Sequence, residues 1–288
     1  MKKFSVLIAH YNNYNYFRDC HESLLRQTYQ NFEAIILDDC STDGSFDKLQ
    51  TLVGDDPRFI VLRNTQNLGV GYTKKRLVEL ASGEICGFVD PDDAITENAI
   101  QESVNSYRDE EVIATYSYIK ICDEHLVFTK IFPNTRKVRK SNPLFFNIGF
   151  EISHFFTFRK SAYQKIRGIN PDLRVAEDMD LYLQLYYLGR IIFIPKPLYL
   201  YRIHDNGLSH TPEKENLKNE NWHLVIKETL RRRNITRLYG TPISEISDLP
   251  KFIYKKENTL SRKILSKFSK AKRRLIQKMA SVFKALPE

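Results

Sequence analysis

The sequence predicts an α/β fold with a Rossmann-like, mostly parallel central sheet flanked by helices, and a helical extension at the C-terminus. Short apolar segments alternate with single segments of helical periodicity through residues 4–89, which is the pattern of βαβ units with right-handed crossovers. Acidic side chains follow directly after two of these apolar segments, at Asp38-Asp39 and at Asp90-Pro91-Asp92-Asp93. Residues 260–286 repeat apolar side chains every three or four positions, which predicts the terminal helix.

The elements follow in order along the chain. Apolar runs predict buried parallel strands over residues 4–9, 32–37, 59–62 and 85–89. Helical spacing and cap residues predict helices over residues 16–27, 46–53 and 72–81. Further on we expect strands at residues 112–122, 126–132, 154–159 and 191–194, an extended segment at 195–201, helices at 98–107, 161–166, from 177 and at 216–233, and then a loop that holds Pro242 and Pro250.

The extension carries the positive charge of the chain. Residues 251–288 contain twelve Lys and Arg residues against Glu257 and Glu288, whereas residues 1–250 contain 32 basic and 33 acidic residues. A body this close to neutral argues against nucleic acid as a partner, because such binding needs clustered positive charge. The basic amphipathic helix over residues 260–286 suits peripheral contact with an anionic membrane; packing on the body and a homodimer seam are the alternatives.

Length and cysteine usage indicate the class and compartment of the protein. A chain of 288 residues with 42% hydrophobic content can form one large domain or a domain with an appendage. Four scattered cysteines lack the paired spacing of a disulfide framework or a zinc site, which indicates a reducing compartment. The first apolar run ends at His10, too early for a signal peptide, and no run reaches the ~18 residues of a membrane span. We therefore expect a cytoplasmic protein, at the inner face of the membrane if the terminal helix binds lipid.

The first, second and fourth strands are expected to end at one edge of the sheet, where open α/β sheets bind ligands. That edge then carries His10-Tyr11, Asp38-Asp39 and Asp90 to Asp93. Three carboxylates in one turn repel one another, and the nearest basic residues in sequence, Arg76 and Arg108, are too distant to be local partners. We therefore expect neutralisation from outside the chain by a divalent cation, Mg²⁺ or Mn²⁺, which carboxylate oxygens suit. A solvated acidic turn is the alternative.

Five motifs in this order resemble the inverting family 2 glycosyltransferases with the GT-A fold, over about residues 4 to 210. The motifs are Ser5-Val6-Leu7-Ile8, Leu37-Asp38-Asp39-Cys40-Ser41-Thr42-Asp43-Gly44, Asn67-Leu68-Gly69, Asp90-Pro91-Asp92-Asp93 and Glu177-Asp178-Met179-Asp180-Leu181. The resemblance implies a nucleotide-diphospho-sugar donor, usually a UDP-sugar, and a divalent cation, Mn²⁺ or Mg²⁺. It also implies a nucleotide-sugar-binding half at residues 1–100 and an acceptor-binding half at 101–210. The basic helical extension at 211–288 lies beyond the resemblance and departs from the catalytic pattern.

The resemblance implies that the nucleotide binds to the N-terminal half. The residues it assigns there are Ala9, His10, Tyr11, Asp38, Asp39, Asn67, Gly69, Lys74 and Asp90. Among them Asp39 corresponds to the carboxylate that reads the base, and a carboxylate suits the ring N–H of uracil; an Asp that caps the next turn is the alternative. The family commonly has Arg-Asn where this chain has Lys74-Lys75, and lysine lacks the planar, two-pronged hydrogen bonding of arginine.

The resemblance also implies which residues bind the metal, which acts as the catalytic base and which contact the acceptor. Asp92 is expected to coordinate the metal together with His204, and Asp178 corresponds to the catalytic base. Secondary or acceptor contacts are expected from Glu177, Asp93, His154 and Arg202, with the neighbouring phenylalanines Phe155, Phe156 and Phe158 either lining the acceptor pocket or lying in the core. Taken alone, Asp178 also fits an acidic helix start and His204 an ordinary surface histidine.

These features predict an inverting, metal-dependent glycosyltransferase that moves a sugar to a hydroxyl of a glycan acceptor. By family analogy the acceptor is a lipid-linked precursor of a surface polysaccharide. Two alternatives stay open: a nucleotidyltransferase, which uses a similar metal–carboxylate site, and a non-catalytic module that binds sugar nucleotides or membranes. A dinucleotide-dependent oxidoreductase is disfavoured because no G-x-G-x-x-G follows the first strand.

Overall fold

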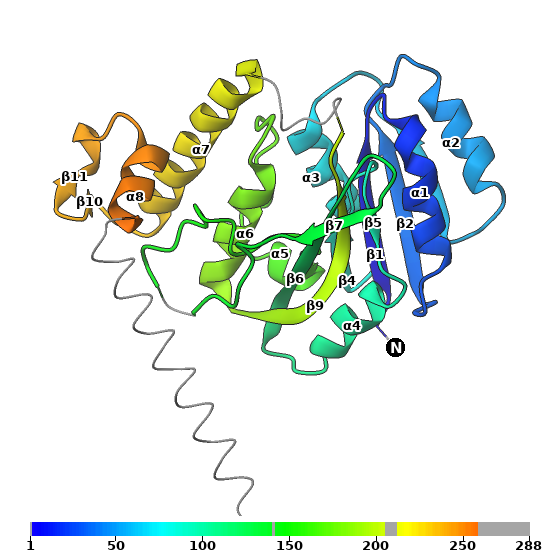
Figure 1. The fold of residues 1–288 in the computed structure, drawn as a ribbon, viewed down its shortest axis with the longest axis horizontal. Helices are drawn as coiled ribbons and strands as arrows, with labels where there is room; N and C mark the ends of the chain where they lie inside the picture. The colour runs from blue at the N-terminus through cyan, green and yellow to red at the C-terminus, as the bar shows by residue number, and fades with distance from the viewer. Residues whose placement is uncertain (1, 140–141, 205–211, 259–288) are drawn as a thin grey trace, which may run out of the picture. The chain divides into compact units, whose positions relative to one another are not determined.

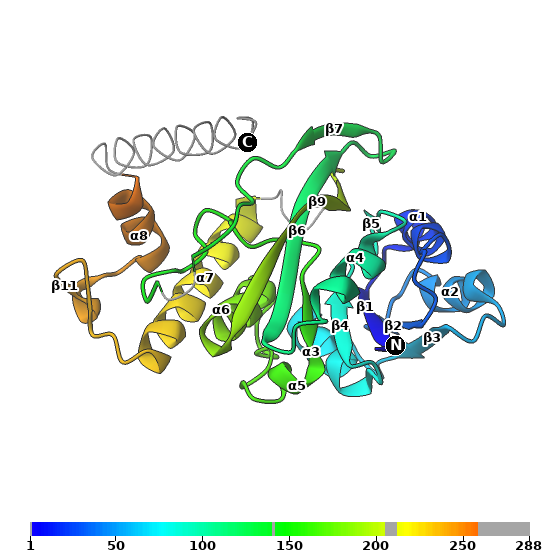
Figure 2. The ribbon, with the colours of Figure 1, turned by 90° about the horizontal axis from the view of Figure 1, so that it is seen from below.

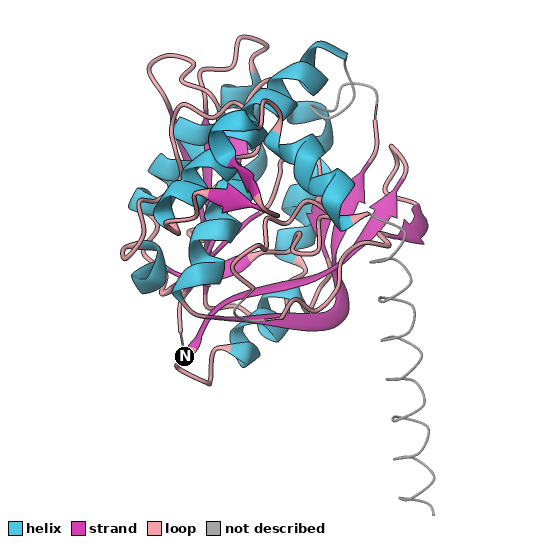
Figure 3. Ribbon diagram, turned by 90° about the vertical axis from the view of Figure 1, so that its left-hand side faces the viewer, coloured by secondary structure: helices cyan, strands magenta, loops and turns pink. Residues whose placement is uncertain are grey.

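The computed structural model describes residues 2–139, 142–204 and 212–258 (Figure 1). The contacts divide the chain into two compact units, residues 1–229 and 230–288. In the described part of the first unit, nine strands form one sheet with the order β3-β2-β1-β4-β8-β6-β9-β5, and β7 pairs with β6. Helices cover both faces of this sheet (Figure 3). The predicted α/β class is confirmed.

The N-terminal half of the sheet is parallel, as predicted. Its strands are β1 (Phe4–His10), β2 (Phe32–Asp38), β3 (Phe59–Arg63) and β4 (Ile85–Phe88). The crossover helices are α1 (Tyr14–Leu25), α2 (Ser45–Val53) and α3 (Val70–Leu80). Each element lies within about two residues of its predicted bounds, because buried strands and amphipathic helices have distinct hydrophobic periods.

The second half of the sheet is mixed. It contains β5 (Ala94–Ile95), α4 (Ala99–Ser106), β6 (Val112–Cys122), β7 (Phe128–Ile131), β8 (Thr157–Arg159), α5 (Lys160–Tyr163), α6 (Glu177–Leu188) and β9 (Arg190–Arg202). Strand β8 is antiparallel to both β4 and β6, whereas β9 runs parallel to β6 and lies beside it (Figure 2). The strand expected from residue 154 begins only at Thr157.

Strand β9 corrects one prediction. The sequence suggests a short strand at residues 191–194 and an extended segment after Pro195, but the structure has a single strand of 13 residues. Its pairing with β6 runs from Ser117 opposite Ile194 to Tyr118 opposite Pro197, and the register shifts there. The irregularity accommodates Pro195, which has no N–H to give to the ladder, so the strand continues to Arg202.

Two cores lie on opposite faces of the sheet. Phe4, Val6 and Ile8 of β1 pack on one face with residues of α1, α2 and α4. Leu7 points the other way and packs with residues of α3, α5 and α6. This alternation follows from the two-residue period of a strand. Since both faces are covered, the ends of the strands are the part of the sheet open to a ligand.

The second unit is small and helical. Helix α7 (Pro212–Arg232) leads into it, and it contains β10 (Arg237–Leu238), β11 (Thr241–Pro242), a 3₁₀ turn (Ile243–Glu245) and α8 (Leu249–Glu257). The predicted loop at Pro250 is wrong, because Pro250 lies in the first turn of α8, where a missing N–H costs no helix bond. The helix predicted over residues 260–286 lies outside the described residues. No helix in the described part is long and apolar enough to cross a membrane.

A buried glutamate links three segments of the N-terminal half and makes their stability depend on pH. The Glu33 carboxylate accepts hydrogen bonds from the Ser5 hydroxyl (2.6 Å) and from the Ser82 amide and hydroxyl (2.7 Å each), and it pairs with Lys3 (2.7 Å). Burial opposes its charge, but these hydrogen bonds outweigh burial and lower the pKa of Glu33 to about 2.

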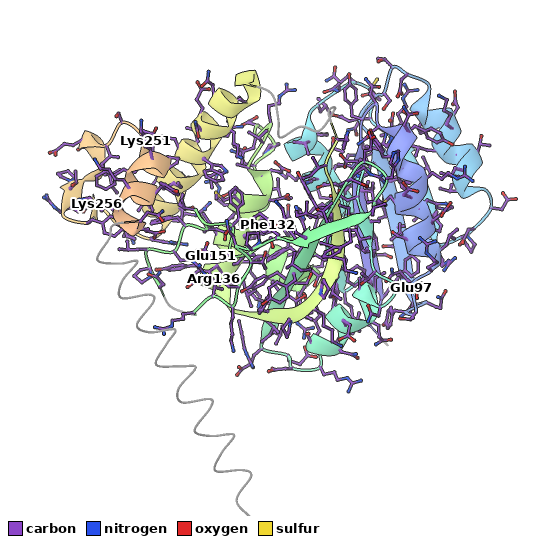
Figure 4. The ribbon with its side chains drawn as sticks, viewed as in Figure 1. Glu97, Phe132, Arg136, Glu151, Lys251 and Lys256 are labelled. Atoms are coloured by element: carbon purple, nitrogen blue, oxygen red, sulfur yellow. The ribbon has the colours of Figure 1, made fainter. Side chains whose placement is uncertain are left out.

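Glu33 is therefore expected to stabilise the fold fully above pH 4.5, its usual pKa, and to lose this contribution as the pH falls toward 2. The loss amounts to about 3 kcal/mol at most. Urea unfolding between pH 2.5 and pH 6 tests this, and Glu33→Gln is expected to flatten the dependence of unfolding free energy on pH. Glu97→Gln, at an exposed position (Figure 4), is the matched control. An unchanged slope in Glu33→Gln contradicts the assignment.

Candidate functional site

The candidate site lies at the carboxyl edge of β1, β2 and β4. His10 is paired with Asp38 in the register of β1 and β2, and the Asp39 amide donates to the His10 carbonyl (2.8 Å). Beyond β4, the Val89 amide donates to the carbonyl of Leu7 in β1 (3.1 Å), so the chain enters the acidic turn beside the same strand. The predicted meeting of the three strand ends at one edge is confirmed.

Asp38 and His10 form a buried pair beneath this edge. The Asp38 carboxylate lies 3.2 Å from the His10 Nδ1 atom, accepts from the Ser41 amide (3.0 Å) and hydroxyl, and lies 3.3 Å from the Arg63 Nε atom. Burial disfavours the charged form, but the hydrogen bonds from His10 and Ser41 outweigh it and hold the pKa of Asp38 below its usual value. The carboxylate therefore stays ionised and fixes the loop that follows β2.

Asp39 orders the loop that contains Asn67 and Gly69. Its carboxylate accepts from the Asn64 side-chain amide (2.7 Å) and from the backbone amides of Leu68 (3.0 Å) and Gly69 (2.7 Å). Gly69 has φ 86°, a conformation that disfavours any side chain. Asn64 is buried and was not predicted, because an asparagine after a strand resembles any turn residue.

The acidic turn, Asp90 to Asp93, is contacted by basic side chains from distant parts of the chain, and the expected divalent cation stays a prediction. The Lys74 Nζ atom lies 3.6 Å from Asp90, and the His204 Nε2 atom lies 2.9 Å from Asp92. The Arg202 backbone amide donates to Asp93 (2.8 Å). These partners come from α3 and from the end of β9, far from the turn in sequence, and only the fold brings them there.

Asp93 differs from its neighbours because it is buried. Burial, followed by the charges of Asp92 and Asp90, raises the pKa of Asp93 well above its usual range. The Tyr199 hydroxyl hydrogen-bonds to Asp93 and accepts from the Asp90 amide (3.1 Å). Asp93 is therefore a buried carboxyl that shapes the turn through its hydrogen bonds to Tyr199 and Arg202. Tyr199 was not predicted, since a tyrosine in an apolar strand carries no functional signal.

Arg202 contacts the backbone of the acidic turn. Its guanidinium donates to the Asp92 carbonyl (2.7 Å) and the Glu124 carbonyl, and it pairs with Asp19 (2.6 Å). It also lies 4.7 Å from the centroid of the Tyr16 ring. The side chain is buried and engaged on several sides, so the structure places it as a residue that positions Asp92.

Lys74 joins the acidic turn to the start of α6. Its ammonium lies 2.7 Å from Glu177 and 3.0 Å from Asp178, and only 3% of the residue is exposed. Burial disfavours the ammonium, but the charges of Asp178, Glu177 and Asp90 outweigh burial and raise the pKa of Lys74 well above its usual value. One cation therefore holds carboxylates from two distant segments of the chain at one point.

His154 lies on the other side of Asp178. Its Nε2 atom is 3.8 Å from the Asp178 carboxylate, and its ring stacks on Tyr199 with the centroids 4.9 Å apart. The phenylalanines that follow it, Phe155, Phe156 and Phe158, are buried in the cores, which favours the core alternative over a pocket lining. Asp178 thus lies between an ammonium and an imidazole.

The donor set at the turn fits a hard divalent cation that shares its shell with a ligand. Asp92 offers carboxylate oxygens beside the His204 imidazole, and Asp90 lies two positions before it. In the described ranges no three His, Cys, Asp or Glu side chains are grouped to hold a metal alone. Mg²⁺ is typically held by one or two carboxylates together with substrate phosphates, and Asp92 and Asp90 are carboxylates of the kind such a shell uses.

Sequence comparisons agree with this geometry. The chain matches the sequence model of "Glycosyl transferase family 2" over residues 5–167. It is 27% identical over 261 residues to a chondroitin synthase of Escherichia coli, which covers 89% of this chain and 37% of the relative. It is 29% identical over 222 residues to the putative glycosyltransferase EpsH of Bacillus subtilis, which covers 73% and 64%. The chain thus spans between about a third and two thirds of the length of these two relatives.

Solved structures resemble the fold at low sequence identity. S. aureus TarS 1–349 superposes with a TM-score of 0.62 at 23% identity, over 79% of this chain and 65% of that one. Its complex with UDP-GlcNAc gives a TM-score of 0.62 at 22% identity, over 80% and 66%. A mannosyltransferase from Pyrobaculum calidifontis in complex with GDP-Man and Mn²⁺ gives 0.55 at 14% identity, over 87% and 67%. Since the family match covers more than half of the chain and the fold agrees with it, this protein belongs to glycosyl transferase family 2 and has the GT-A fold.

Proposed function

We propose that this protein is an inverting, metal-dependent glycosyltransferase that moves a sugar from a UDP-sugar to a hydroxyl of a glycan acceptor. The observation that carries the proposal is the Lys74 contact, which holds Asp178 at 3.0 Å and Asp90 at 3.6 Å from one ammonium. In a single displacement the catalytic base lies on one side of the anomeric carbon and the residues that hold the diphosphate lie on the other. The Lys74 contact keeps Asp178, the proposed base, and Asp90, on the diphosphate side, within one site.

The reaction assigned to the site is a direct displacement at the anomeric carbon. The acceptor hydroxyl loses its proton to the Asp178 carboxylate while its oxygen bonds to the anomeric carbon. The bond between that carbon and the diphosphate breaks on the opposite face, which inverts the configuration and releases UDP. A cation held by Asp92 and His204 supplies positive charge to the leaving diphosphate when it is bound. His154 lies beside Asp178 and limits the orientation of its carboxylate.

The UDP donor is supported by the site and by the relatives. Of roughly four acceptor positions on the Asp39 carboxylate, three are used by Asn64, Leu68 and Gly69, which leaves one for the ring N–H of a base. Ala9, His10 and Tyr11 lie at the end of β1 beside it. TarS is described in complex with UDP and with UDP-GlcNAc, and other relatives are synthases of chondroitin and hyaluronan.

The acceptor and location follow from the relatives and the extension. Chondroitin and hyaluronan synthases and a putative teichuronic acid glycosyltransferase are among the relatives, which supports a surface polysaccharide as product. We assign the lipid-linked precursor as acceptor, at the cytoplasmic face of the membrane. The basic residues 260–286 are proposed to contact anionic lipid, and a homodimer seam is the competing use of this segment.

A thermal-shift screen of nucleotide sugars with and without Mn²⁺ tests the proposal. One UDP-sugar is expected to raise Tm by about 5–8 °C at a hundred times its Kd, and only with the metal present. Asp92→Asn is expected to abolish the metal dependence. Product analysis then separates the alternatives, since a transferase releases UDP and a nucleotidyltransferase releases pyrophosphate. Binding without turnover of any acceptor favours the non-catalytic module, and the absence of any shift overturns the proposal.

A further inference from the structure

Two aromatic rings and a lysine, half-buried except for the exposed Phe150, form a group that the proposed reaction does not use. Lys218 and Trp222 lie one turn apart on α7, and the ring centroids of Phe150 and Trp222 are 5.1 Å apart at an interplanar angle of 46°. The Lys218 ammonium lies 5.5 Å from the centroid of each ring. We call Phe150, Lys218 and Trp222 the aromatic corner.

The loop before β8 presents Phe150 outward. Phe150 has φ 55°, a left-handed conformation that is unfavourable for a bulky residue, and 37% of it is exposed. Its amide donates to the Asn147 carbonyl (2.9 Å), and the buried Asn147 side chain exchanges two hydrogen bonds with the backbone of Ile152 (2.8 and 2.9 Å). The turn is therefore built to hold an aromatic ring at the surface, where burial does not repay the conformational cost.

Helix α7 holds the corner next to the proposed base. The Asn221 side-chain amide donates to the carbonyl of Val175 (3.2 Å), three positions before Asp178. Trp222 packs against the small core that contains Met179, the residue after Asp178. These contacts join α7 to the segment that leads into α6 and to the first turn of that helix, close in sequence to Asp178.

The loop that carries Phe150 also leads to a residue beside Asp178. His154, which lies 3.8 Å from Asp178, is four positions after Phe150. Four residues span about 14 Å at most, so Phe150 lies within that distance of His154 along the chain. This separation is within the length of a short oligosaccharide, so we take the corner and Asp178 to contact different units of one glycan.

The corner carries the positive charge of Lys218. Its ammonium lies over the rings of Phe150 and Trp222. Glu151, the residue after Phe150 in sequence, is paired with Arg136 at 2.6 Å (Figure 4). Aromatic faces stabilise an ammonium and also offer an apolar surface to the C–H face of a sugar ring.

Building on the glycosyl transfer proposed above, we infer that the aromatic corner binds an acidic pyranose unit of the acceptor glycan. The ring of that unit packs on Trp222 and Phe150, and its carboxylate or phosphate pairs with Lys218. The corner is thus an acceptor subsite that selects for an anionic sugar beside the reacting unit.

Tryptophan fluorescence tests this directly, because Trp222 is the one tryptophan among the 288 residues. The full chain is titrated with a hyaluronan tetrasaccharide, glucose 6-phosphate, chitotetraose and inorganic phosphate. A saturable fluorescence change is expected with at least one of the two acidic sugars, at an affinity about tenfold above that for neutral chitotetraose. The hyaluronan and glucose 6-phosphate titrations distinguish a carboxylate from a phosphate as the recognised group.

Variants separate charge from ring packing. Lys218→Met is expected to lower the affinity for the acidic sugar about tenfold, whereas Lys227→Met, at an exposed position of the same helix, leaves it unchanged. Phe150→Leu is expected to weaken acidic and neutral sugars alike without lowering Tm. No saturable change with either acidic sugar, equal affinity in Lys218→Met, or equal binding of inorganic phosphate overturns the inference.

The test is independent of the donor. If the protein binds a UDP-sugar but no sugar binds at the aromatic corner, the inferred subsite is wrong and the proposed function is unaffected. Sugar binding at the corner without any donor binding removes the proposed function instead.

Discussion

Replacing Asp178 with asparagine is expected to lower kcat by about 10² to 10⁴ and to leave the Kd of the UDP-sugar within about twofold. Asparagine keeps the shape of the side chain but cannot accept the proton of the acceptor hydroxyl. The donor contacts assigned to Asp39, Asp90 and Asp92 stay intact. Initial rates of UDP release and calorimetric titration of the donor measure the two quantities separately.

The matched control for this variant is Asp172→Asn, which changes an exposed aspartate in the loop before the same helix. Its kcat and donor affinity are expected to equal those of the wild type. If Asp178→Asn turns over as fast as this control, the base is another residue. If it loses donor affinity to the same extent as kcat, Asp178 belongs to the donor site and not to the acceptor side.

Replacing Lys74 with methionine is expected to destabilise the protein by about 3–5 kcal/mol and to abolish transfer. The change leaves Glu177, Asp178 and Asp90 close together without the cation that they share. In a protein of this size the loss lowers Tm by about 10 °C. Thermal unfolding of Lys74→Met against Lys75→Met, the neighbouring lysine on α3, measures the effect.

A second substitution distinguishes charge from packing at this position. Adding Glu177→Gln to Lys74→Met removes one of the uncompensated carboxylates and is expected to restore about 1–3 kcal/mol of stability. Because the pKa of Lys74 is raised, its contribution is fully present at neutral pH and is lost only above the usual lysine range. Equal unfolding of Lys74→Met and Lys75→Met, or no rescue by Glu177→Gln, contradicts the role of Lys74.

Local pattern predicted the first half of the sheet well. The strands at β1, β2, β3 and β4 have few polar residues and are bounded by turn residues, so their period and their ends are both visible in the sequence. Prolines misled the prediction twice. Pro195 lies in a strand whose irregular pairing accommodates it, and Pro250 begins a helix; both depend on what surrounds the proline.

The sequence by itself determined the parallel βαβ character of the first half of the sheet, the edge at which its strands end and the acidic residues gathered there, because each follows from a local period and from the connectivity of βαβ units. The tertiary structure alone decided which side chains contact those acids. Lys74 lies on the crossover helix before β4 and His204 lies beyond β9, so the Coulomb energy between these groups and the acidic turn depends on distance in space. The same folding placed Lys74 against Asp178, which no spacing of residues along the chain predicts.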